Sequence, residues 1–108
     1  MPGNLESKLQ SDILCDLRSF GKYCECFKIE KTSDNGTPDI FFTTKFTGPV
    51  FIETKRSGEK ARKLQEVRIK RLNECGAKAF VCSNWSEWFR VKQLVGLNKE
   101  NVILSHNM

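Results

Sequence analysis

Length, composition and charge exclude several classes of protein. The chain has 108 residues, 39% of them hydrophobic, and its 18 Lys and Arg against 13 Asp and Glu give a formal net charge of +5. Such a chain is predicted to fold as one domain over residues 1–108, with its core at about 5–95, and not to be disordered. Its hydropathy pattern predicts no membrane-spanning segment and no signal peptide, so we expect a protein of the cytoplasm or nucleus.

The five cysteines lack the regular spacing of a secreted disulfide framework. We interpret them as reduced thiols, some of them in the core. The alternative is a zinc site formed by Cys24, Cys26, Cys75 and Cys82, although neither pair has the usual ligand spacing.

Positive charge is concentrated between residues 55 and 71, where eight residues are basic and two are acidic. A basic segment on an otherwise balanced chain indicates a polyanionic partner, although a solvated helix face is the simpler alternative. We expect phosphate contacts from five basic residues, four of which belong to this segment. They are Lys28, Arg56, Lys60, Arg62 and Lys63.

The first predicted element is a helix over residues 5–20, which ends at Gly21. Apolar residues recur there at helical spacing and form one stripe. Glu6 falls inside this stripe, so its carboxylate would point inward, although Asp16 lies near the stripe as well. The periodicity alone therefore does not single out Glu6.

Three strands are predicted next, at residues 26–30, 39–44 and 50–55. Turn-forming residues at 34–38 separate the first two strands, and the turn at 47–49 joins the last two as a hairpin.

The second half of the chain alternates between helix and strand. A helix over 60–75 and a strand over 77–82 predict a strand–helix–strand unit with parallel strands and a right-handed crossover. Residues 84–94 predict a further helix, whose Trp85, Trp88 and Phe89 would fill the core or a dimer seam. Residues 98–108 have no clear period and predict either a short edge strand or a flexible tail.

Acidic side chains converge on the predicted hairpin. Asp39 begins one strand, while Glu53 and Lys55 lie two residues apart on the other and therefore project to one face. Oxygen ligands of this kind suit Mg²⁺, and the carbonyl of Thr54 could add another. Glu6 would supply a further carboxylate, directly or through water.

Lys55 would orient the attacking water or stabilise the transition state, and Gln65, in the apolar stripe of its helix, would hold Lys55 or that water. Each residue alone has a structural explanation, such as a surface ion pair or a turn acid. No one of these explanations predicts the others, so together the residues favour phosphodiester hydrolysis.

Four short motifs therefore stand in a particular order along the chain. They are Glu6, Gly36-Thr37-Pro38-Asp39, Phe51-Ile52-Glu53-Thr54-Lys55 and Gln65. Their order and gaps resemble the PD-(D/E)XK nuclease superfamily, most closely its VRR-NUC branch, over about residues 6–81. The resemblance implies an α/β, restriction-endonuclease-like core, in which a mixed sheet is flanked by helices.

The resemblance also implies an activity. Members of this family cleave DNA with Mg²⁺ or Mn²⁺ and no organic cofactor, so Asp39, Glu53 and the Thr54 carbonyl would be metal ligands and Lys55 the catalytic lysine. Stand-alone members from phages and bacteria resemble Holliday-junction resolvases. We therefore expect a homodimeric, structure-selective endonuclease for branched or junction DNA, in the cytoplasm of a bacterial or phage-infected cell. The alternative is a non-catalytic nucleic-acid-binding module on the same fold.

Overall fold

The computed structural model describes residues 5–30, 36–56 and 62–107, without the side chains of Leu5 and Glu6. In this part of the chain no helix has the length and apolar character needed to cross a membrane. In chain order, the elements are α1 (Leu5–Arg18), a short 3-10 helix (Gly21–Tyr23), β1 (Glu25–Lys28), β2 (Ile40–Thr44), β3 (Gly48–Thr54), α2 (Lys63–Glu74), β4 (Lys78–Cys82), α3 (Trp85–Val95) and α4 (Lys99–His106).

The four strands form one mixed sheet in the order β1-β2-β3-β4. β1 pairs with β2 and β2 with β3 in antiparallel fashion, whereas β3 and β4 run parallel, as the hairpin and the strand–helix–strand unit predicted. This topology brings the beginning of β2 and the ends of β3 and β4 to one end of the sheet. The predicted site residues of the hairpin lie at that end.

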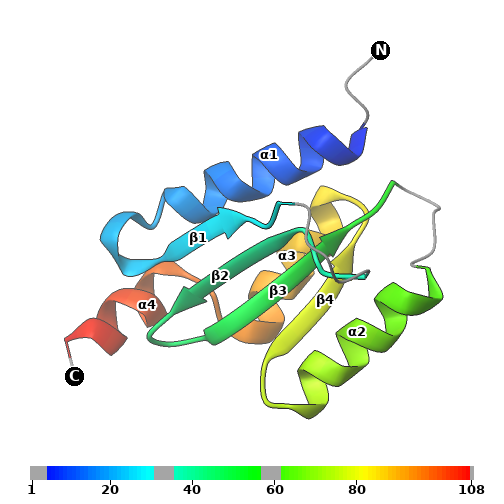
Figure 1. Ribbon diagram of the computed structural model, residues 1–108. Helices are drawn as coiled ribbons and strands as arrows, with labels where there is room; N and C mark the ends of the chain where they lie inside the picture. The colour runs from blue at the N-terminus through cyan, green and yellow to red at the C-terminus, as the bar shows by residue number, and fades with distance from the viewer. Residues whose placement is uncertain (1–4, 31–35, 57–61, 108) are drawn as a thin grey trace.

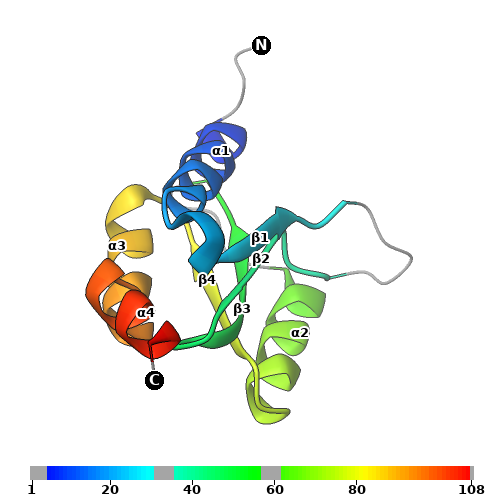
Figure 2. The same ribbon diagram turned by 90° about the vertical axis from the view of Figure 1, so that its left-hand side faces the viewer.

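Helices cover the two faces of the sheet unequally. α1, α3 and α4 lie on one face and α2 on the other (Figures 1 and 2). The hydrophobic core fills the space between the sheet and the group of three helices. Its fully buried members include Ile13, Leu17, Ile40, Phe42, Val50, Ile52, Trp88 and Val102.

The aromatic residues of α3 divide between the core and the surface. Trp88 is buried, and its indole N–H donates a hydrogen bond of 2.8 Å to Asp16, which also pairs with Lys92 at 2.7 Å. Trp85 and Phe89 are exposed. The helix therefore contributes one aromatic side chain to the core and presents two at the surface.

α2 lies along β4 and is held at its end by a side-chain amide. Asn73 donates to the carbonyl of Ala79 at 3.1 Å and accepts from its N–H at 3.0 Å. β4 is an edge strand, so this amide satisfies the backbone groups on its outer side. α2 begins at Lys63, and residues 57–61 lie outside the described part of the chain.

The expectation of an edge strand or a flexible tail at residues 98–108 is wrong, because residues 99–106 form α4. The Asn98 side chain accepts the N–H of Asn101 at 2.8 Å, which caps the first turn of the helix. Val102 is fully buried, so the core also extends beyond residue 95. Eight residues with one buried position show too little periodicity for the helix to be recognised from sequence.

Candidate metal centre

Asp39 and Glu53 lie at the same end of the hairpin. The backbone of Asp39 donates to the carbonyl of Ile52 at 3.0 Å and accepts from the N–H of Ile29 at 2.7 Å, which anchors it between two strands. The β2–β3 register ends at the Ile40–Ile52 pair, and because the N–H of Asp39 also bonds the carbonyl of Ile52, Asp39 lies at the end of the sheet next to this last pair. The Glu53 side chain projects to the face that carries α2, where it contacts Gln65, whereas the Asp39 carboxylate contacts Thr54.

The carboxylate of Asp39 is held by Thr54. Its Oδ2 accepts hydrogen bonds of 2.8 Å from both the N–H and the hydroxyl of Thr54. The same hydroxyl accepts a bond of 2.8 Å from Nε2 of Gln10 on α1. Gln10 and Thr54 are both buried, so a core hydrogen-bond chain fixes the orientation of this carboxylate.

Gln10 was not among the site residues predicted from the sequence. The one available signal is its position at the border of the apolar stripe of α1, beside Leu17 on the helical wheel. An amide in such a position requires a polar partner. The partner lies 44 residues further along the chain, and nothing local in the sequence indicates it.

Glu53 is only 2% exposed and is held by two donors. Its Oε2 accepts a hydrogen bond of 2.7 Å from Nε2 of Gln65 and lies 3.2 Å from Nζ of Lys55. The side chain of Lys55 is 11% exposed. Burial of a carboxylate is unfavourable unless such partners compensate for the lost water. The structure therefore brings the acid, the lysine and the glutamine into direct contact.

Gln65 uses both ends of its amide. Its Oε1 accepts the backbone N–H of Arg62 at 2.8 Å, which satisfies a free donor at the beginning of α2, while its Nε2 bonds Glu53. In the structure Gln65 contacts Glu53, which in turn contacts Lys55. A glutamate at this position could also cap the helix, but it would place a second negative charge against Glu53.

A glycine turn places Asp39 beside α2. Gly36 has a φ of +84°, and a Cβ atom there would lie 2.7 Å from the carbonyl oxygen of Leu64. Only a residue without a side chain permits this approach and this backbone conformation at little cost. The turn, the end of β3 and the beginning of α2 therefore meet at the carboxylates.

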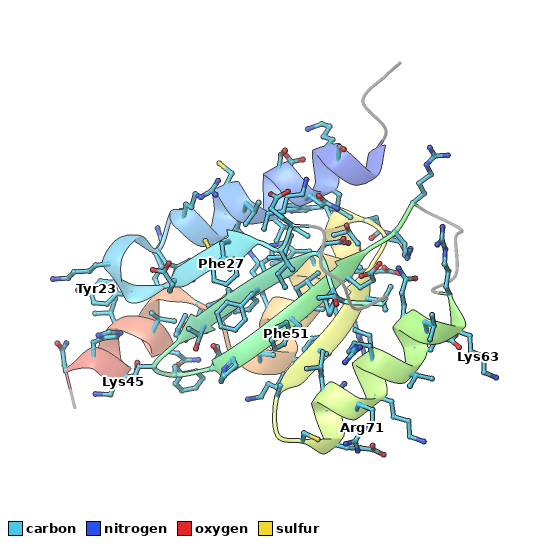
Figure 3. The ribbon with its side chains drawn as sticks, in the orientation of Figure 1. Tyr23, Phe27, Lys45, Phe51, Lys63 and Arg71 are labelled. Atoms are coloured by element: carbon cyan, nitrogen blue, oxygen red, sulfur yellow. The ribbon has the colours of Figure 1, made fainter. Side chains whose placement is uncertain are left out.

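The other predicted residues can be placed only in part. Glu6 belongs to the first turn of α1, but its side chain, like all of Lys60, lies outside the described residues. Four predicted phosphate contacts are exposed and lie near the site end of the sheet, where Figure 3 labels Lys63 at the beginning of α2. They are Lys28, Arg56, Arg62 and Lys63.

The donor set of this site suits a hard divalent cation. Asp39 and Glu53 supply two carboxylates, and Mg²⁺ is usually bound by one or two carboxylates together with water and substrate phosphate. Among the described residues no three His, Cys, Asp or Glu side chains cluster as a metal site. A pair of carboxylates completed by water and phosphate is consistent with that observation.

The cysteines do not form the alternative zinc site. Cys24 and Cys26 lie at or next to β1 and Cys82 in β4, at opposite edges of the sheet, and Cys75 is exposed after α2. Burial raises the pKa of Cys24 and of Cys82 to about 12. Both thiols are therefore protonated at neutral pH in the metal-free protein.

Comparisons with known proteins agree with the fold. No family model and no curated protein matches the amino-acid sequence. A solved structure described as "VRR_NUC domain" is similar to this chain with a TM-score of 0.71 at 19% identity, over 82% of this chain and 94% of that one. The chain thus has the fold of a VRR_NUC domain, a PD-(D/E)XK-like mixed sheet flanked by helices, as the motifs predicted.

Proposed function

We propose that this protein is a divalent-metal-dependent endonuclease that hydrolyses phosphodiester bonds in branched DNA. The observation that carries the proposal is the contact of Lys55 and Gln65 with Glu53, at the same end of the sheet as Asp39. The similarity of the chain's fold to that of a VRR_NUC domain supports the same proposal. Exposed basic residues near the site suit a phosphate backbone.

Asp39, Glu53 and the carbonyl of Thr54 would hold the metal, with Glu6 as a further carboxylate from α1. A bound Mg²⁺ or Mn²⁺ supplies Lewis-acid stabilisation of the charge that develops on the scissile phosphate. Lys55 orients the attacking water or stabilises the same charge. Gln65 keeps Glu53 in position and leaves the ammonium of Lys55 beside it.

The first experiment tests cleavage. Labelled four-way junction, flap, nicked and linear DNA would be incubated with the protein and Mg²⁺, Mn²⁺ or EDTA. The isosteric variant Asp39→Asn keeps an oxygen for the bonds from Thr54 but removes the charge. We expect it to lose about 100-fold or more of the cleavage rate. The matched control is Asp12→Asn, an exposed acid of α1 that pairs with Lys8.

Two results would overturn the proposal. Binding of every DNA without cleavage under either metal would support the non-catalytic binding module. Undiminished cleavage by Asp39→Asn would place the chemistry elsewhere. Titration of the protein with Mn²⁺, followed by electron paramagnetic resonance, gives a readout that does not depend on cleavage.

The choice of substrate and the oligomeric state belong to the same proposal. In a domain of this size we expect recognition of DNA shape and backbone rather than of a base sequence. Two copies with opposed sites would cut both strands of a junction. Sedimentation of the protein with and without junction DNA tests the homodimer, and faster cleavage of the junction than of linear DNA tests the selectivity.

A further inference from the structure

Three phenylalanines form a continuous strip across the sheet. Phe27, Phe41 and Phe51 are direct partners on β1, β2 and β3. Their ring centroids lie 5.1 Å apart between the first two and 5.2 Å apart between the last two. Figure 3 shows Phe27 and Phe51 on the same side of the sheet. We call these three residues the phenylalanine strip.

The strip begins beside Glu53. Phe51 precedes Glu53 by two residues on β3 and pairs with Phe41 on β2, so strand alternation sets these three side chains on one face. From there the strip runs to the edge strand β1, where Phe27 is 48% exposed. A DNA strand that reached Glu53 from this side would pass close to the rings.

The described structure leaves this face partly uncovered. Of the described elements, α2 alone lies on it, at the side of β4 (Figure 2). Asn73 of α2 bonds the outer edge of β4, so the opposite flank of the helix, with Leu64 and Arg68, is turned toward the strip. Leu64 is exposed and Arg68 is half-buried. The apolar strip thus has a basic flank.

We propose that the phenylalanine strip stacks against unpaired bases of the DNA strand that enters the site. Aromatic side chains beside positive charge are the combination that binds single-stranded nucleic acid without sequence preference. Bases in a duplex are stacked on one another and do not present their faces. The strip would therefore favour DNA with unpaired nucleotides, such as forks, flaps and opened junctions.

This inference deepens the proposed function. It rests on that function because the candidate metal site sets where the DNA strand would approach the phenylalanine strip. A second copy of the chain is the competing occupant. It would cover the rings next to Asp39 and Glu53 and obstruct the approach of DNA to them. Nucleic acid uses both the rings and the charge of Arg68, so it fits the surface better.

The test compares binding of single-stranded and duplex DNA in EDTA. Fluorescence anisotropy would follow a labelled thymidine oligonucleotide of about 15 nucleotides, a forked duplex and a blunt duplex. The variants are Phe27→Ala and Phe27→Trp. The matched control is Phe89→Ala, because Phe89 is 53% exposed on α3, which lies against the opposite face of the sheet.

We expect Phe27→Ala to weaken binding of the single strand and the fork about tenfold and binding of the duplex less than about twofold. Phe27→Trp should restore binding, and Phe89→Ala should change nothing. Circular dichroism confirms that each variant is folded. Quenching of a 2-aminopurine base in the oligonucleotide, lost in Phe27→Ala, reports stacking directly.

Equal weakening of all three DNAs, or none, would overturn the inference. So would a wild-type dimer that Phe27→Ala converts to a monomer, because a second copy would then occupy the strip. These failures differ from failure of the proposed function. If Asp39→Asn abolishes cleavage while Phe27→Ala has no effect on binding, only the stacking surface is rejected. If no cleavage occurs but Phe27 governs single-strand binding, only the nuclease activity is rejected.

Discussion

The two carboxylates of the site are held in different ways. Glu53 is bound directly by Lys55 and Gln65, whereas Asp39 is bound by Thr54, whose hydroxyl reaches Gln10 in the core. The orientation of Asp39 therefore depends on a hydrogen-bond chain of buried side chains. Side chains in such supporting positions affect metal affinity without coordinating the metal themselves.

The first prediction concerns Thr54→Val, which removes the hydroxyl at nearly constant volume. It leaves the amide of Gln10 without its partner, so we expect a loss of about 1–3 kcal/mol of unfolding free energy. Asp39 loses one of its two bonds from Thr54, and Mn²⁺ affinity should fall about tenfold. Urea unfolding and Mn²⁺ titration measure the two effects.

Two further variants separate orientation from stability. Thr54→Ser keeps the hydroxyl and should retain the Mn²⁺ affinity. The double variant Gln10→Leu/Thr54→Val replaces both partners by apolar groups, so it should recover much of the stability but not the affinity. Recovery of both would mean that the hydroxyl serves the core alone.

At this scale the sequence indicated Asp39, Glu53, Lys55 and Gln65, because turn chemistry and strand or helix periodicity are local properties. It did not indicate Gln10 or the contact of Gln65 with Glu53. Both depend on side chains that are distant in the chain.

At the scale of elements, the site depends on how closely a turn approaches a helix. Gly36 touches the backbone of Leu64 in the first turn of α2, the turn that also contains Gln65. The position of this helix is thereby coupled to the turn that carries Asp39. Gly36 and the carbonyl oxygen of Leu64 lie so close together that a Cβ atom on residue 36 would have no room.

The second prediction is that Gly36→Ala destabilises the protein more than Gly76→Ala. Both glycines have positive φ, so each substitution carries about 1 kcal/mol of backbone strain. A Cβ atom at Gly76 would meet no other atom within 4 Å, whereas one at Gly36 would lie 2.7 Å from the Leu64 carbonyl oxygen. Overpacking at Gly36 should add about 1–3 kcal/mol in chemical denaturation.

The same comparison tests the site. Gly36→Ala should lower the Mn²⁺ affinity because the turn moves away from α2, while Gly76→Ala should leave it unchanged. Equal losses of stability in the two variants would show that the turn does not press against the helix. The turn before Asp39 and the helix that follows β3 were both predicted from the sequence. How closely the turn approaches the helix was not.

At the scale of the whole molecule, three helices close one face of the sheet and α2 partly covers the other (Figure 2). This asymmetry places the core on one side and the candidate site and phenylalanine strip on the other. α4 completes the covered side, since Val102 is buried in the same core as Trp88. The end of the described chain is therefore part of the fold.

The third prediction tests this role of α4. Val102→Ala removes two buried methyl groups and should lower the unfolding free energy by about 2 kcal/mol. The matched control, Leu104→Ala, changes a side chain of the same helix that is 56% exposed, and its effect should stay within about 0.5 kcal/mol. If thermal unfolding shows the two variants to be equally stable, α4 does not dock as described.

The sequence by itself determined the succession of strands and main helices along the chain and the placement of Asp39, Glu53 and Lys55 at one end of the hairpin. These features follow from periodicity, turn residues and spacing, which act between near neighbours. The tertiary structure alone decided that residues 99–106 form a helix and that the cysteines lie apart. It also decided that Gln10 supports Asp39 and that three phenylalanines align across the strands. Each of these depends on strand register or on packing between distant segments, which local sequence patterns do not encode.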